Sequence, residues 1–152
     1  MNVQSVLLFE ADDIEAVVGL AVEQAEEGAT YIDVNVGMRE PGFMAMLVEK
    51  IQEKVDLPLC IDTPDLETQK AGIAAYDPAK ANGALPLVNS ISELRMELME
   101  LLNIQPVKMV LMCTERKEGE DRFSNDTAQE IYDTAIQIKN RHGAFHTFSG
   151  QN

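Results

Sequence analysis

Four polar residues in the first half of the chain have the types and spacing of a small-molecule binding site. They are Asp33, Asn35, Asp62 and Asn89, and each lies at the end of a short apolar run, where the chain turns toward a helical segment. A carboxylate accepts two parallel N–H hydrogen bonds from an amino-pyrimidine edge, and an Asn amide both donates and accepts. This set of side chains therefore suits a flat heterocycle that carries N–H donors and ring acceptors.

Each of these residues also has an ordinary structural interpretation. Asp and Asn after a strand are common helix caps and turn residues. For any single position, capping is the simpler explanation. Four polar strand ends in succession shift the interpretation toward ligand binding.

The pattern of apolar residues predicts the elements that must position these side chains. Apolar runs predict strands at residues 31–36, 57–61, 85–88 and 107–112, with a weaker pattern at 6–9. Helical spacing predicts helices near residues 14–25, 43–55, 66–75, 92–102 and 127–141, and a charged loop is expected at 114–124. The expected N-caps are Asp12 or Asp13 for the first helix, Ser90 or Ser92 for the fourth, and Asn125 or Asp126 for the last, with C-terminal stops at Gly28 and Gly143.

Strands that alternate with helices predict an α/β fold with parallel pairing and helical crossovers. The strands are short and apolar, so we expect them to be buried on both faces. In a parallel barrel or open sheet, the carboxyl ends of all strands lie on one side, and ligands bind on that side. The four polar residues are therefore expected to lie near one another.

Composition excludes several classes of protein. The chain has 152 residues and a net charge of -14, which disfavours binding to nucleic acid or to anionic membranes. No apolar run approaches the roughly 20 residues of a membrane span, and residues 1–10 do not resemble a signal peptide. Cys60 and Cys113 lie in separate apolar runs without metal-site spacing, so we predict buried thiols in a cytoplasmic protein and no metal site.

Other common catalytic patterns are missing from the sequence. No Gly-rich turn follows a predicted strand, so a phosphate loop is not expected. His142 and His146 lie away from the predicted strand ends, and no Ser-His-Asp or Cys-His arrangement can be assembled. The sequence therefore offers binding residues but no identifiable catalytic residue.

Three segments resemble, in order, motifs of the pterin-binding domains. Residues 26–37 read EEGATYIDVNVG and resemble the "EGGA-x-x-x-D-x-N-x-G" motif, and residues 57–63 read LPLCIDT and resemble "LPLC-x-D-[ST]". Residues 87–92 read LVNSIS and resemble "[IL]-[IV]-N-S-x-[ST]". These motifs occur in dihydropteroate synthases, in the folate module of cobalamin-dependent methionine synthase and in methyltetrahydrofolate:corrinoid methyltransferases. Cys60, two residues before Asp62, and the charged loop behind residues 109–114 favour the corrinoid branch.

The resemblance implies a fold and a site. The fold would be a partial (β/α)8 TIM-type barrel with about five βα units and parallel strands. Asp62 and Asn89 match residues that hydrogen-bond the pterin ring in this family, and Asp33 and Asn35 match the polar pair at the preceding strand end. Of that pair, Asn35 is expected to face the ligand or its neighbours.

The resemblance also implies an activity. The protein would bind a reduced folate, or a related pterin such as a methanopterin, as methyl donor. It would take part in transferring the N5 methyl group to a corrinoid (cobalamin) carried by a partner protein. A homo-oligomer is expected, because association would cover open sheet edges.

The sequence departs from the family pattern at both ends. The family's first strand carries "GER-[IL]-N", whereas this chain reads VLLFEA at residues 6–11, and the family's later strand ending in "[ILV]-D-P" has no counterpart. A complete barrel of this class has about 250 residues. We therefore expect residues 1–152 to form a single domain that is incomplete relative to the full barrel, with residues 144–152 as a disordered or atypical tail.

Two alternatives remain open at the level of sequence. The chain could be a non-catalytic, truncated module of the pterin-binding type that assembles through its open sheet edge. It could instead be a doubly wound binder of some other small molecule, in which case the ordered motifs would be a coincidence. Folate binding and methyl transfer to cobalamin would distinguish these alternatives from the enzyme.

Overall fold

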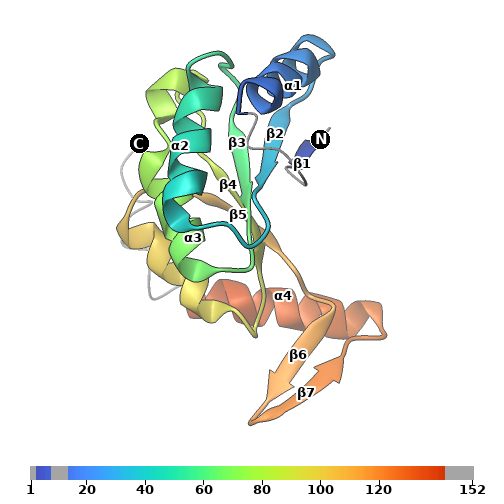
Figure 1. Ribbon diagram of the computed structural model, residues 1–152. Coiled ribbons are helices and arrows are strands. Elements are labelled where there is room, and N and C mark those ends of the chain that lie inside the picture. The colour runs from blue at the N-terminus through green and yellow to red at the C-terminus, as the bar shows by residue number, and fades with distance from the viewer. Residues whose placement is uncertain (1–2, 8–13, 143–152) are drawn as a thin grey trace. The chain divides into compact units, whose positions relative to one another are not determined.

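Strands and helices alternate along the chain, as the apolar patterns predict (Figure 1). The computed structural model describes residues 3–7 and 14–142. The elements are β1 (Val3–Leu7), α1 (Ile14–Glu26), β2 (Tyr31–Asn35), α2 (Pro41–Gln52), β3 (Leu59–Asp62), α3 (Leu66–Ala75), η1 (Pro78–Ala81), β4 (Leu87–Ile91), η2 (Met96–Asn103), β5 (Lys108–Leu111), β6 (Glu115–Glu118), β7 (Asp121–Ser124) and α4 (Ala128–His142). None of the described helices is long and apolar enough to cross a membrane.

The main sheet is wound in one direction. Its strand order is β1-β2-β3-β4-β5, and β1 to β4 pair in parallel. A doubly wound sheet would reverse its strand order at a switch point, whereas a (β/α) barrel adds each strand beside the previous one. The prediction of an α/β fold with partial TIM-type winding is confirmed, and the doubly wound alternative does not fit the described strands.

The contacts divide the described chain into two compact units. The first unit contains the described residues up to Asn89 together with residues 100–109, and the second contains residues 90–99 and the described residues from Val110 onward. The first unit carries α1, α2, α3 and the strands that bear the predicted site. The second unit carries β6, β7 and α4.

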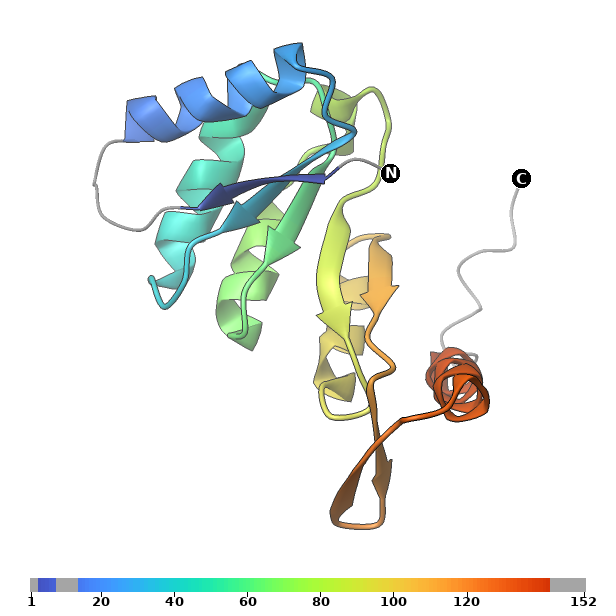
Figure 2. The same ribbon diagram turned by 90° about the vertical axis from the view of Figure 1, so that its right-hand side faces the viewer.

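The core of the first unit lies between the sheet and its helices. Figure 2 shows α2 and α3 on the same side of β2 and β3. The fully buried apolar side chains of this layer include Ile32, Val34, Met44, Leu47, Val48, Ile51, Leu59, Ile61 and Ile73. A Cβ atom on Gly72 of α3 would lie 2.8 Å from Met44 Cγ and 3.0 Å from Ile61 Cγ2, so α3 packs at close range on both α2 and β3.

The start of α3 follows the prediction, and the local chemistry explains it. Asp65 is the N-cap, and its Oδ2 accepts a 2.7 Å hydrogen bond from the Thr68 N–H. The pKa of Asp65 is lowered, first by the Thr68 hydroxyl and then by the Thr68 N–H, since both bonds favour the carboxylate. Gln69 Nε2 donates to the Ile61 carbonyl at 2.8 Å, which attaches the first turn of α3 to the end of β3.

In the second unit, the predicted charged loop is wrong. Most of residues 114–124 form an antiparallel hairpin of β6 and β7, with Glu115 opposite Ser124 and Glu118 opposite Asp121. The Arg116 guanidinium lies 5.4 Å from the Phe123 ring centroid and pairs with Glu118. The run of charged residues had suggested a solvated loop, but Arg122 Nε donates across the ribbon to Glu115 Oε2 at 2.8 Å, and this ion pair together with the Arg116–Phe123 contact joins the two strands.

The predicted cap of the last helix is also wrong. Thr127, and neither Asn125 nor Asp126, lies at the N-cap position: the Glu130 N–H donates to Thr127 Oγ1 at 3.2 Å, and the Thr127 N–H donates to Glu130 Oε2 at 2.9 Å. This reciprocal pair is a capping box. The buried Asn125 side chain instead donates to the Cys113 carbonyl at 2.9 Å and to Thr134 Oγ1 at 2.8 Å.

Other boundaries differ from the sequence predictions. The first strand is described at Val3–Leu7, and residues 8 and 9 of the strand predicted at 6–9 lie outside the described residues. β4 continues to Ile91, and the segment after β4 is a 3-10 helix at Met96–Asn103. β5 is not buried on both faces, since Val110 and Leu111 are 37% and 42% exposed. The predicted caps Asp12 and Asp13, the stop at Gly143 and the tail at 144–152 lie outside the described residues.

Gly72→Ala is expected to lower the free energy of unfolding by about 1–3 kcal/mol, because the added methyl group overpacks the contact with Met44 and Ile61. Gly19→Ala is the matched control. Gly19 is exposed and no atom lies within 4 Å of a Cβ at this position, so α1 should gain up to about 1 kcal/mol from the better helix former. Urea unfolding measures both variants, and equal shifts in the same direction would contradict the packing argument.

Thr127→Ala is expected to destabilise the protein by about 0.5–2 kcal/mol through loss of the capping box. The effect should depend on pH. The pKa of Glu130 is lowered, first by the Thr127 hydroxyl and then by the Thr127 and Asp126 N–H groups, so its stabilising contribution is present above its unfolded pKa and is lost as pH falls through the folded pKa.

The difference in melting temperature between wild type and Thr127→Ala should therefore become smaller as the pH is lowered. Thr114→Ala, an exposed Thr of the same unit, serves as the control. A difference that stays constant down to acidic pH would contradict the assigned role of Glu130.

Candidate functional site

Three of the four predicted polar residues lie in one row across the sheet. The parallel register places Asn35 of β2 opposite Asp62 of β3, and Asp62 opposite Asn89 of β4. Asn35 and Asp62 are the last residues of their strands, so this part of the row is at the carboxyl edge of the sheet. All three side chains are partly buried.

The row faces away from α2 and α3. Successive side chains in a strand point to opposite faces. Ile61 lies against Gly72 of α3, so its neighbours Cys60 and Asp62 point to the other face of the sheet. The register puts Asn35 and Asn89 on that same face, which corresponds to the interior side of a (β/α) barrel.

Hydrogen bonds join the first two residues of the row. Asn35 Nδ2 donates to Asp62 Oδ2 at 3.1 Å, and the Gly37 N–H donates to Asn35 Oδ1 at 2.9 Å. The Asn35 amide therefore uses both of its ends within the loop and the neighbouring strand. The outcome is a carboxylate at the edge of the sheet that is held by an amide from the adjacent strand.

Asp33 lies one row deeper on the same face. It is 6% exposed, and the register places it opposite Cys60. The pKa of the Cys60 thiol is raised strongly, first by burial, then by its hydrogen bond with Asp33 and by the negative charges of Asp33 and Asp62. Tyr31, Cys60 and Leu87 form a buried cluster beneath the row, so the deeper layer supports the polar edge.

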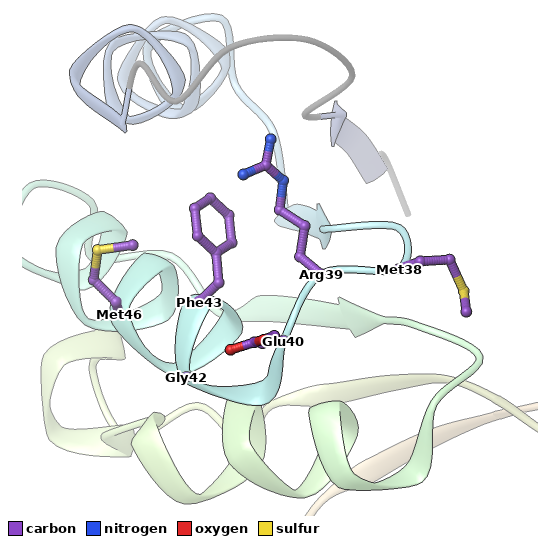
Figure 3. A pocket seen from close by; sticks show the side chains of 6 residues that line it. All are labelled: Met38, Arg39, Glu40, Gly42, Phe43 and Met46. Carbon is purple, nitrogen blue, oxygen red and sulfur yellow. The ribbon is translucent and has the colours of Figure 1, made fainter.

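The loop between β2 and α2 forms a shallow pocket beside this edge. The pocket has a volume of about 570 Å³ and is lined by Met38, Arg39, Glu40, Gly42, Phe43 and Met46. Figure 3 shows the Arg39 side chain beside the Phe43 ring, with the guanidinium carbon 4.6 Å from the ring centroid. Figure 3 also shows Met38 pointing away from these two side chains.

The motifs noted in the sequence therefore converge in space on one face and one edge of a singly wound sheet. The sequence model of a family described as pterin binding enzyme matches residues 7–144, nearly the whole chain. This chain belongs to the pterin-binding enzyme family. The predicted resemblance to the pterin-binding superfamily is confirmed.

A curated relative of this family member is the methylcorrinoid:tetrahydrofolate methyltransferase of Eubacterium limosum. The two proteins are 44% identical over 75 residues. The aligned segment covers 47% of this chain and 26% of the relative, so the match spans about a quarter of the methyltransferase. This relationship places the pterin-binding family member close to the methyltransferases that act on folates and corrinoids.

Sequence reasoning identified the residues of the row but not their contacts. Asn89 was predicted to follow its strand, whereas it lies inside β4, two residues before its end. The hydrogen bond from the Gly37 N–H to Asn35 Oδ1 was not predicted, although the N-x-G spacing at 35–37 is typical of such a turn. The pocket after β2 was also not predicted. Most of the residues that line it come from the segment MREPGF at 38–43.

The raised pKa of Cys60 predicts low reactivity in the folded protein, because the thiolate is the nucleophile. In a Cys113→Ala background, Cys60 should react with a disulfide reagent at pH 8 only as slowly as the protein opens, and rapidly in denaturant. The Cys60→Ala protein gives the reaction rate of Cys113 alone in the same assay. Fast reaction of Cys60 in the native protein would contradict its burial between the two carboxylates.

Proposed function

We propose that this chain binds a reduced folate, or a related pterin, at the row formed by Asn35, Asp62 and Asn89, with Asp33 beneath it. We further propose that it takes part in methyl transfer between N5 of that pterin and a corrinoid carried by a partner protein. The observation that carries the proposal is the alignment of the row across three adjacent parallel strands at the ligand-binding edge of the fold. Family membership and the E. limosum relative support it.

The chemistry of the side chains fits a pterin. An amino-pyrimidine edge presents parallel N–H donors, and the Asp62 carboxylate is a matching double acceptor. The Asn89 amide donates and accepts, so it matches a ring nitrogen or the carbonyl edge of the same ring. With Asn35 holding Asp62 at 3.1 Å, the acceptor is oriented before the ligand arrives, which lowers the entropic cost of binding.

The role proposed for the row is to bind the ring and fix its orientation. Transfer of a methyl group from a tertiary amine requires a proton or a strong hydrogen bond at N5, because the amine is otherwise a poor leaving group. A fixed ring keeps N5 at one position relative to the partner's corrinoid, which would accept or supply the methyl group. The name of the relative describes transfer from a methylcorrinoid to tetrahydrofolate, and the same site would serve transfer in either direction.

A second candidate function is supported by β5. Val110 and Leu111 of this strand, and Met112 directly after it, expose apolar surface. In this candidate, the chain is a non-catalytic module of the pterin-binding type that assembles through its sheet edge. It predicts self-association in sedimentation experiments that is lost in Leu111→Lys, together with weak folate binding and no methyl transfer.

Asp62→Ala is expected to abolish binding of methyltetrahydrofolate in isothermal titration calorimetry while leaving the fold intact, because the variant loses the charged acceptor of the pyrimidine edge. Asn89→Ala should weaken binding by about 1–3 kcal/mol, the cost of leaving a buried partner unsatisfied. Glu49→Ala on the exposed surface of α2 is the control. Unchanged affinity in Asp62→Ala would reject the role of Asp62, and a large loss of thermal stability in Asn89→Ala without ligand would mark Asn89 as structural.

The methyl-transfer proposal has a direct optical test. Wild-type protein mixed with methyltetrahydrofolate and cob(I)alamin should accelerate the loss of the cob(I)alamin absorbance, and Asp62→Ala should not. Free cobalamin stands in for the corrinoid of the partner protein. Tight folate binding without any acceleration would favour the non-catalytic candidate.

A further inference from the structure

We propose that Asn35 is a positioning residue, whose amide is locked by Gly37 and holds the Asp62 carboxylate in the orientation that a pterin requires. This inference rests on the proposed function and adds a role for a residue that need not contact the ligand. It is carried by two hydrogen bonds that meet on one side chain. Each bond fixes one end of the amide.

The orientation of the Asn35 amide depends on the backbone conformation at Gly37. Gly37 has a φ of 60°, in the left-handed region that side chains rarely adopt. This conformation turns the loop after β2, and the Gly37 N–H then donates to Asn35 Oδ1 at 2.9 Å. A backbone N–H can only donate, so the oxygen of the Asn35 amide must face it.

The orientation of the Asn35 amide then determines whether Asp62 faces a hydrogen-bond donor or an acceptor. With Oδ1 facing Gly37, the NH2 group of Asn35 faces β3 and donates to Asp62 Oδ2 at 3.1 Å. The opposite amide orientation would bring two donors together at Gly37 and two oxygens together at Asp62. The bond to Gly37 therefore selects the single orientation in which Asn35 supports a carboxylate.

Charge makes this donor important. The titratable groups on this face of β2 and β3 are Tyr31, Asp33, Cys60 and Asp62, and the neighbouring strand β4 contributes Asn89, which does not titrate. The pKa of Cys60 is raised first by burial, then by its hydrogen bond with Asp33 and by the negative charges of Asp33 and Asp62. The Asn35 NH2 group places a partial positive charge next to Asp62, which favours its ionised form and limits its rotation.

Asn35→Asp separates positioning from local structure. The new carboxylate retains an oxygen for the Gly37 N–H, so the turn after β2 is preserved, but it replaces the donor that faces Asp62 with an acceptor of like charge. In the ligand-free variant, the carboxyl titration of Asp62, followed by 13C NMR, should move to higher pH by about one unit or more. The affinity for methyltetrahydrofolate at pH 7 should fall about tenfold or more.

The control variants decide among the outcomes. Asn35→Ala loses both hydrogen bonds and should also bind weakly, while Glu49→Gln on α2 should match wild type in both measurements. An unshifted Asp62 titration and unchanged affinity in Asn35→Asp would overturn the inference. Wild-type protein that binds no folate would instead overturn the proposed function, and the ligand-free titration would still test whether Asn35 controls Asp62.

Discussion

The rest of the site depends on the parallel register of β2, β3 and β4. Because these strands are neighbours in space in the same order as in the chain, the ends of successive βα units meet at one edge. The register pairs Asn35 with Asp62 and Asp62 with Asn89. A shift of one residue in any of these strands would turn its polar side chain to the helix-covered face, where an unpaired amide is unfavourable and an unpaired carboxylate strongly so.

The two faces of the sheet differ in chemistry, and the proposed binding residues all lie on one of them. On one face, Ile61 and the helices α2 and α3 form a tightly packed layer in which Gly72 leaves no room for a methyl group. On the other face, apolar Tyr31, Cys60 and Leu87 support a polar edge. Tight packing on the first face holds the backbone positions of the second, and the proposed pterin site would need that precision to orient a ring.

Much of the architecture follows from local sequence. The apolar pattern predicted α3 at its observed bounds, and polar residues at strand ends identified Asp33, Asn35, Asp62 and Asn89 as a group. The errors arose where local signals compete. Thr127 is the N-cap of α4 because Glu130 lies three residues later, although Asn125 and Asp126 are equally good caps by residue type. The β6–β7 hairpin was missed because its strands consist mostly of charged residues and lack an apolar alternation, while the ion pair between Arg122 and Glu115 forms only across the folded ribbon.

The sequence by itself determined the order of elements, the family motifs and the identity of the polar residues, because these depend on spacing along the chain. Tertiary structure alone decided that Asn35 donates to Asp62, that Asp33 lies beside Cys60, and that the loop from Met38 to Phe43 forms a pocket. Those contacts join residues whose approach is set by strand register and by the left-handed turn at Gly37. Residue type indicates that a carboxylate and an amide can pair, but only the folded backbone brings Asn35 and Asp62, 27 residues apart, to within 3.1 Å.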